Sequence, residues 1–99
     1  RARAKLREME TRLLPGDVLF EEGDEGQDMY ILLEGALDIK KGRAVIARLE
    51  DSGTFVGEMS YLTGAPRSAT IVAPDGASGR ASCFRLRRRR LSADEHPTG

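Results

Sequence analysis

Residues 53–73, GTFVGEMSYLTGAPRSATIVA, are the stretch that decides the fold of this chain. Within it, Glu58 directly follows Gly57, and Arg67 comes nine positions after Glu58. The residues after Gly57 include too few β-branched side chains for a strand, so we predict a tight turn followed by one or two helical turns. Pro66 restricts the backbone on the approach to Arg67. The stretch therefore predicts a glycine, a short helix and an arginine in a defined order.

These residue types match the parts of a cyclic sugar phosphate. Gly57 lets the backbone approach an anion because no Cβ stands in the way. The free N–H groups of the helical turn that follows point at such an anion, and the helix dipole favours it. Arg67 offers a planar fork for two phosphate oxygens, and Glu58 can accept a hydrogen bond from a ribose hydroxyl. Without a ligand, Glu58 and Arg67 would also suit a structural ion pair.

The rest of the chain has short apolar runs separated by turn residues, a pattern typical of a β protein. Apolar residues alternate with other side chains around Val18 and Phe20 and again around Leu37 and Ile39. Glycines separate these short runs near plausible turns, at Gly23, Gly26, Gly35, Gly42 and Gly53. Such spacing predicts an antiparallel sandwich or barrel.

The central stretch resembles the phosphate-binding cassette of cyclic-nucleotide-binding domains, as in catabolite activator proteins and protein kinase A regulatory subunits. The run Gly23-Asp24 and the run YILLEG at residues 30–35 also look like the first half of that family. The resemblance covers residues 12–91, and it implies a mainly β fold, an eight-stranded antiparallel β-roll of jelly-roll type with short flanking helices. The cassette positions that match are Gly53, Gly57, Glu58, Ser60, Leu62, Pro66, Arg67, Ser68, Ala69 and Thr70.

The resemblance also implies roles for individual residues. The backbone of Gly57 and Ser60 would contact the phosphate or the ribose, and Glu58 would hold the ribose 2′-hydroxyl. Arg67 would hold the phosphate, and Ser68 the phosphate or the base edge. The full set of predicted ligand-binding residues is Gly57, Glu58, Met59, Ser60, Arg67, Ser68 and Ala69, with no catalytic residue, no metal ligand and no cofactor.

We expect a single domain over residues 1–99. Leu6, Met9 and Leu13 recur at helical spacing, which predicts an N-terminal helix over 1–14 that ends at Pro15-Gly16. The β-roll is expected over 15–90 with the cassette at 53–70, and the start of a C-terminal helix over 91–99.

The sequence departs from the family pattern in three places. Tyr61 stands where the family often has leucine, and the loop over 74–82 is slightly longer than usual. The family's long C-terminal helix, which caps the purine, would lie beyond Gly99. We therefore expect these residues to bind cAMP and cGMP with affinities within about tenfold of each other. The first residue is Arg1 rather than Met, which favours a longer protein.

Composition and histidine content weigh against other functions. Lys plus Arg and Asp plus Glu both number 16, so the net charge is zero and bulk attraction to nucleic acid is not expected. The arginine run Arg87–Arg90 could form a patch that contacts nucleic acid. We prefer the interpretation that it is the end of a strand with solvated side chains. His96 is the only histidine, which disfavours a small metal enzyme and a histidine-dependent nucleophile.

The sequence thus predicts a regulatory, non-enzymatic module that binds a cyclic nucleotide, cAMP in preference to cGMP, and relays binding to an effector domain or flanking segment. The alternative is a degenerate β-roll that has kept its fold and lost its ligand. We expect no membrane insertion, because the longest apolar run is Met29–Leu33, and association of copies through the flanking helices is an option. The single cysteine, Cys83, and the lack of a secretory signal predict a cytoplasmic protein.

Overall fold

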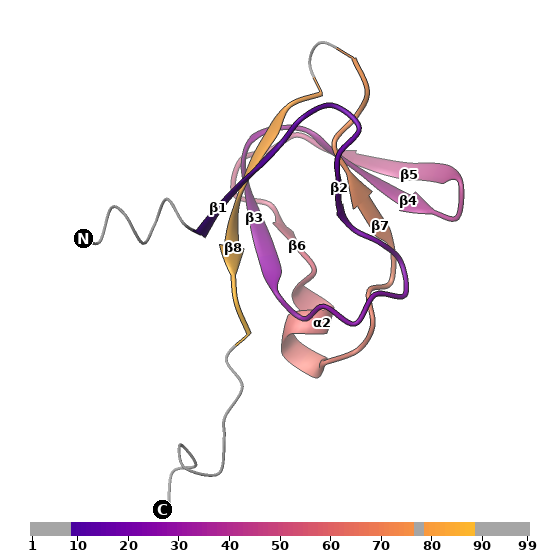
Figure 1. Cartoon of the computed structure of the whole chain (residues 1–99), viewed down its shortest axis with the longest axis vertical. Coiled ribbons are helices and arrows are strands. Elements are labelled where there is room, and N and C mark those ends of the chain that lie inside the picture. The colour runs from indigo at the N-terminus through magenta and orange to yellow at the C-terminus, as the bar shows by residue number, and fades with distance from the viewer. Residues whose placement is uncertain (1–8, 77–78, 89–99) are drawn as a thin grey trace, which may run out of the picture.

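A computed structural model describes residues 9–76 and 79–88 of the chain. These residues form eight β-strands and one short helix (Figure 1). The strands are β1 (Glu10–Leu13), β2 (Val18–Phe20), β3 (Met29–Gly35), β4 (Leu37–Lys41), β5 (Ala44–Leu49), β6 (Phe55–Val56), β7 (Thr70–Val72) and β8 (Ala81–Leu86), and the helix is α2 (Glu58–Thr63).

The strands make two four-stranded sheets, in the orders β1-β8-β3-β6 and β2-β7-β4-β5. Every strand pair is antiparallel. Strands adjacent in a sheet are mostly far apart in the chain, so the chain passes repeatedly between the sheets. This arrangement confirms the predicted mainly β, eight-stranded roll.

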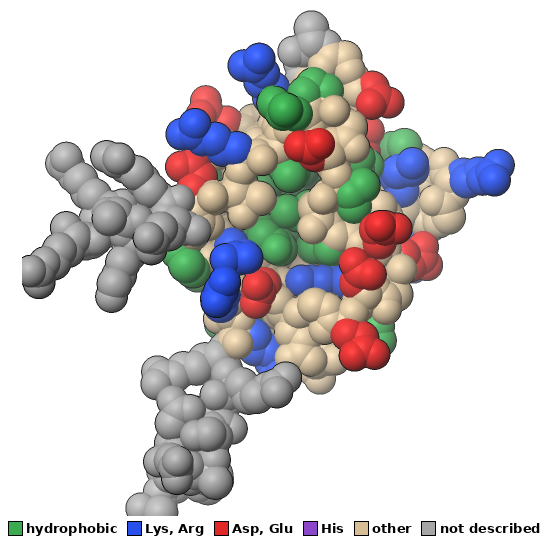
Figure 2. Space-filling view, in the orientation of Figure 1, with side chains coloured by type: hydrophobic (Ala, Val, Ile, Leu, Met, Phe, Trp, Pro, Cys, Tyr) green, Lys and Arg blue, Asp and Glu red, His purple; other side chains and the backbone are tan. Residues whose placement is uncertain are grey.

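The core lies between the two sheets and is built from alternating inward side chains. Leu32, Leu37 and Cys83 are fully buried. The remaining buried members of this cluster are Leu13, Tyr30, Val56, Ile71, Ala73 and Ala81. Figure 2 shows apolar side chains gathered over the middle of one face with charged side chains around its rim. A core this small leaves little stability to spare.

The N-terminal segment differs from the sequence prediction. Residues 10–13, expected to be helical, form β1, which pairs with β8 so that Leu13 lies opposite Ala81. Burial of Leu13 against the sheet outweighs the local helical spacing, because most of the stability of a short helix comes from tertiary packing. The roll therefore begins at Glu10 rather than at residue 15. Residues 1–8 and the helix expected over 91–99 lie outside the described residues.

The helix α2 lies at one end of the roll, directly after β6, and contacts β3 (Figure 1). It confirms the one or two helical turns predicted after Gly57. The segment after α2 returns through Arg67 to β7, in the other sheet. The cassette thus bridges the two sheets and closes one end of the roll.

Candidate functional site

Two left-handed glycines delimit α2. Gly57 precedes the helix with φ of 80°, and Gly64 follows it with φ of 77°. The N–H of Tyr61 donates to the carbonyl of Gly57 at 3.1 Å, and the N–H of Gly64 donates to the carbonyl of Ser60 at 2.8 Å. The first N–H groups of a helix lack intrahelical acceptors, so those at the start of α2 are available to a ligand.

Gly57 is required by its surroundings as well as by its backbone. A Cβ at this position would lie 2.6 Å from Nη1 of Arg67 and 3.1 Å from the carbonyl oxygen of Asp28. Any side chain here would therefore displace the guanidinium. Both the left-handed turn before α2 and the position of the Arg67 guanidinium therefore require a residue without a Cβ at position 57.

Arg67 is held in place along its whole length. Its backbone N–H donates to the carbonyl of Asp24 at 2.8 Å, and its carbonyl accepts from the N–H of Gly23 at 2.8 Å. Its Nη1 donates to the carbonyl of Gly57 at 3.3 Å. Its guanidinium lies over the ring of Phe20, with Cζ 4.0 Å from the ring centroid. The segment after β2 therefore positions the arginine that the cassette supplies.

The charge of Arg67 is buried and lacks a carboxylate partner. The residue is only 4% exposed. None of the ion pairs among residues 9–76 and 79–88 includes it, and its Nε is buried without a hydrogen-bond acceptor. Burial lowers the pKa of Arg67, while the nearby Tyr30, Asp28 and Asp24 act in the opposite direction. Buried charges are normally paired, so this guanidinium is suited to an anion that binds from outside the chain.

Glu58 does not provide that partner. It is solvent-exposed in the first turn of α2, and no ion pair joins it to Arg67. The alternative of a structural Glu58–Arg67 pair is therefore wrong for this structure. The carboxylate is left free to accept hydrogen bonds from a ligand.

All seven predicted site residues line one cavity of about 220 Å³. Arg67, Ser60 and Ala69 are buried in its wall, whereas Glu58, Met59 and Ser68 are exposed. Apolar side chains from both sheets complete the lining, among them Phe20, Ile39, Leu49, Val56 and Ile71. The cavity combines one buried cation, hydroxyl groups and apolar walls, which suits a small anion attached to a flat or apolar group.

A larger hollow of about 570 Å³ involves β1 and β8 and contains none of the predicted site residues. Its lining includes Arg12 and Arg80 but also Glu10 and Glu34, so opposite charges largely compensate there. Glu10 also pairs with Arg12 at 3.5 Å and accepts a hydrogen bond from Ser82 at 2.6 Å. The buried cation without a carboxylate partner, Arg67, lines the cavity at the cassette and not this hollow.

Sequence reasoning missed Phe20 as a site residue. The only local signal was its place in an alternating strand, and it lies 47 residues before Arg67 in the chain (67 − 20). Its role appears only when β2 and the cassette are packed together. Lys41 was missed for the same reason: its ammonium group donates to the carbonyl of Ser68.

Comparison with known proteins identifies the family to which this fold and site belong. Residues 10–92 match the cyclic nucleotide-binding domain family. The chain belongs to this family. The match spans both sheets and the whole cassette, including all seven predicted site residues.

Relatives of this cyclic nucleotide-binding domain include regulatory subunits and kinases. The cAMP-dependent protein kinase regulatory subunit of Hypocrea atroviridis is 37% identical over 62 residues, 63% of this chain and 13% of that protein. The cGMP-dependent protein kinase of Plasmodium berghei is 36% identical over 72 residues, 73% of this chain and 8% of that protein. The chain therefore spans a small part of the length of these relatives.

A solved structure supports the same fold. PKAR CBD2 with bound Sp-2Cl-cAMPS superposes with a TM-score of 0.69 and 28% identity, covering 87% of this chain and 57% of that one. Within the part of this cyclic nucleotide-binding domain that the structure describes, no helix has the length and apolar character needed to cross a membrane.

Proposed function

We propose that this domain binds a cyclic nucleotide in the cavity beside α2, cAMP in preference to cGMP, and performs no chemistry on it. The observation that carries the proposal is the guanidinium of Arg67, which is buried without a carboxylate partner. Two oxygens of a phosphate can accept two parallel N–H groups along one edge of such a guanidinium. The names of two similar proteins, a cAMP-dependent protein kinase regulatory subunit and PKAR CBD2 with bound Sp-2Cl-cAMPS, support cAMP as the ligand. Because another relative is a cGMP-dependent protein kinase, the binding experiment includes cGMP as well.

In the proposed complex, the phosphate lies between Arg67 and the N–H groups at the start of α2. Glu58 accepts the ribose 2′-hydroxyl, and Ser68 reaches the phosphate or the base edge. The purine lies against the apolar wall. The role is binding, because the titratable groups of the lining are the guanidinium of Arg67 and the exposed carboxylate of Glu58.

Calorimetric titration with cAMP and cGMP tests the proposal, with Arg67→Met as the decisive variant. Removing one partner of a buried charged pair costs about 2–5 kcal/mol of binding free energy. The unliganded Arg67→Met protein should unfold at nearly the same denaturant concentration as the parent, because an apolar side chain replaces a buried charge that has no carboxylate partner. Arg43→Met, which removes the same charge from the exposed β4–β5 turn, is the matched control.

Two results would contradict this function. One is the absence of binding to either nucleotide at millimolar concentration. The other is an Arg67→Met variant that binds like Arg43→Met. A large loss of stability in unliganded Arg67→Met would instead favour a structural role for the arginine, as a degenerate β-roll requires.

We further propose that binding is relayed through the end of β8 to an effector outside these residues. The side chain of Arg88 donates to Oε1 of Gln27 at 2.6 Å, and Nε2 of Gln27 donates to the carbonyl of Gly64 at 3.3 Å. The backbone N–H of Arg88 also donates to Asp28 at 3.2 Å. A shift of α2 on ligand binding would therefore reach Arg88 through Gln27.

Amide hydrogen exchange tests the relay. In the parent, cAMP should change protection at Leu86–Arg88, and in Gln27→Ala this change should shrink while cAMP still binds. Equal changes in both proteins would exclude Gln27 as the link. A ligand shifts such an equilibrium only by its different affinities for the two states, so the size of the change reports the coupling.

A further inference from the structure

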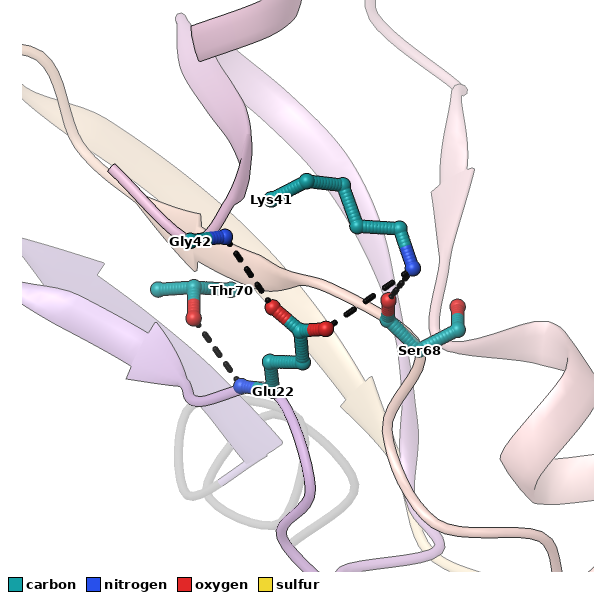
Figure 3. A network of polar contacts seen from close by, with 5 residues as sticks. All are labelled: Glu22, Lys41, Gly42, Ser68 and Thr70. Carbon is teal, nitrogen blue, oxygen red and sulfur yellow. Dashed lines mark hydrogen bonds and ion pairs between the residues drawn. The ribbon is translucent and has the colours of Figure 1, made fainter. Parts of the chain in front are cut away.

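A polar network lies behind the cassette, around the carbonyl of Ser68 (Figure 3). Lys41, the last residue of β4, donates from its ammonium group to this carbonyl. The same Nζ lies 3.9 Å from Oε2 of Glu22. Lys41 does not line the cavity, so it meets the site only through the backbone of Ser68.

Glu22 is itself fixed by two further contacts. Its backbone N–H donates to Oγ1 of Thr70 at 2.9 Å, and its Oε1 accepts from the N–H of Gly42 at 3.2 Å. The network therefore joins three segments that are distant in sequence: the segment after β2, the β4–β5 turn and the exit of the cassette (Figure 3).

The contacts bear on how the cassette presents its polar groups. The carbonyl of Ser68 faces Lys41, and the hydroxyl of Ser68 points away from Glu22 (Figure 3). One residue earlier, the N–H and carbonyl of Arg67 are bound by Asp24 and Gly23. Three of the four backbone polar groups of Arg67 and Ser68 are thus held, which restricts the directions in which both side chains can project.

We propose that Lys41 and Glu22 are positioning residues for the anion site. Lys41 orients the peptide group after Ser68, and Glu22 holds the ammonium group of Lys41 in place. This inference rests on the proposed binding of a cyclic nucleotide and adds to it a cation outside the cassette. Preorganised donors bind an anion more tightly because less conformational freedom is lost on binding.

The test compares Lys41→Met with Lys40→Met by titration of cAMP. Lys40 is the neighbouring residue in β4, and its side chain is directed to the opposite face of the strand, so its loss removes the same charge without the Ser68 contact. Lys41→Met should weaken binding about three- to tenfold, which is less than the loss of a direct charged hydrogen bond to the ligand, because Lys41 meets the site only through the backbone of Ser68. Lys40→Met should change the dissociation constant less than about twofold.

Three further variants and conditions separate positioning from a structural role. Lys41→Arg keeps a donor and a positive charge, and it should restore most of the affinity. Glu22→Gln should weaken binding in the parent but add little in Lys41→Met, because the two residues act as one unit. The exposed ion pair is screened by salt, so the affinity ratio of parent to Lys41→Met should fall between about 0.05 M and about 1 M salt.

The outcomes distinguish this inference from the proposed function. If the parent binds cAMP and Lys41→Met binds like Lys40→Met, the positioning role is wrong and the function stands. If Lys41→Met changes only the melting temperature, the role is structural and the inference is likewise overturned. If the parent binds neither nucleotide, the proposed function is wrong. In that case the NMR signals of the Arg67 Nε–H and of the Ser68 and Ala69 amides are compared between Lys41→Met and Lys40→Met. The positioning role stands if these signals shift in Lys41→Met and not in Lys40→Met. It is overturned if they do not shift in Lys41→Met.

Discussion

The guanidinium of Arg67 lies over the ring of Phe20, with Cζ 4.0 Å from the ring centroid. Phe20 supports the cation from β2 through this cation–π contact, while Nη1 of Arg67 donates to the carbonyl of Gly57 and its Nε has no acceptor among the described residues. The negative face of the ring partly offsets the cost of burying a charge that lacks a carboxylate partner.

Replacing Phe20 by leucine should weaken cAMP binding while the domain stays folded. Leucine keeps an apolar surface but removes the cation–π contact, which is worth about 0.5–2 kcal/mol in proteins, depending on desolvation. Calorimetry should therefore show a loss of affinity of about two- to thirtyfold. Phe84→Leu, in β8 and outside the cavity, is the control. Similar affinities for the two variants would show that the ring does not support Arg67.

Replacing Gly57 by alanine should cost both stability and binding. The left-handed backbone alone costs about 1–2 kcal/mol for a residue with a Cβ. The added Cβ would also come within 2.6 Å of Nη1 of Arg67 and push the guanidinium from its place. Gly76→Ala separates the two effects, because Gly76 has φ of 100° and nothing within 4 Å of an added Cβ. Both variants should lose stability in denaturant titrations, and only Gly57→Ala should lose cAMP affinity by tenfold or more, about 1.4 kcal/mol.

Glu58 should discriminate cAMP from 2′-deoxy-cAMP. In the parent, cAMP should bind about tenfold or more tightly, because a hydrogen bond to a charged group contributes about 1.5–3 kcal/mol. Glu58→Ala should bind both ligands with nearly equal, weak affinity. Glu50→Ala, which removes another exposed carboxylate, should keep the preference. A preference for cAMP that survives in Glu58→Ala would assign the ribose contact to another residue.

The domain should lose stability at alkaline pH through Cys83. Burial raises the pKa of this thiol from 9.0 to about 11. The folded state then holds its proton more tightly than the unfolded state, so this contribution to stability is constant below about pH 9 and declines between about pH 9 and 11. The slope for one proton reaches at most about 1.4 kcal/mol per pH unit. Burial also raises the pKa of Tyr30, which acts in the same direction.

Urea titrations of the parent and of Cys83→Ala between about pH 8 and pH 10.5 measure this effect. The variant is expected to be less stable at every pH, because a fully buried side chain is truncated. Its stability should nevertheless fall less steeply with pH. Parallel pH dependences would mean that the thiol does not titrate as its burial requires. The native thiol should also resist alkylation at neutral pH, since the thiolate is the nucleophile.

The order of residues in the cassette was predictable from the sequence because its constraints are local. Gly57 must adopt a left-handed backbone and α2 follows it at once, so the placement of a glycine, a short helix and an arginine is encoded within fifteen residues (53–67). The alternation of side chains along Leu37–Lys41 and the glycines at the turns likewise depend on near neighbours in the chain, which is why an antiparallel sandwich or barrel could be predicted. The eight-stranded β-roll, by contrast, was implied by the resemblance of the cassette to the family.

The partners of the cassette were decided only by the tertiary structure. Residues 10–13 have helical spacing in the sequence, yet they form β1 because Leu13 is buried opposite Ala81, 68 residues later (81 − 13). Phe20 and Lys41 reach Arg67 and Ser68 from two other strands, and neither is marked by a local pattern. Contacts between segments so far apart depend on how the two sheets pack around a common core. The sequence by itself thus determined the segment that we propose binds an anion, and the packing of the sheets determined what holds its arginine in place.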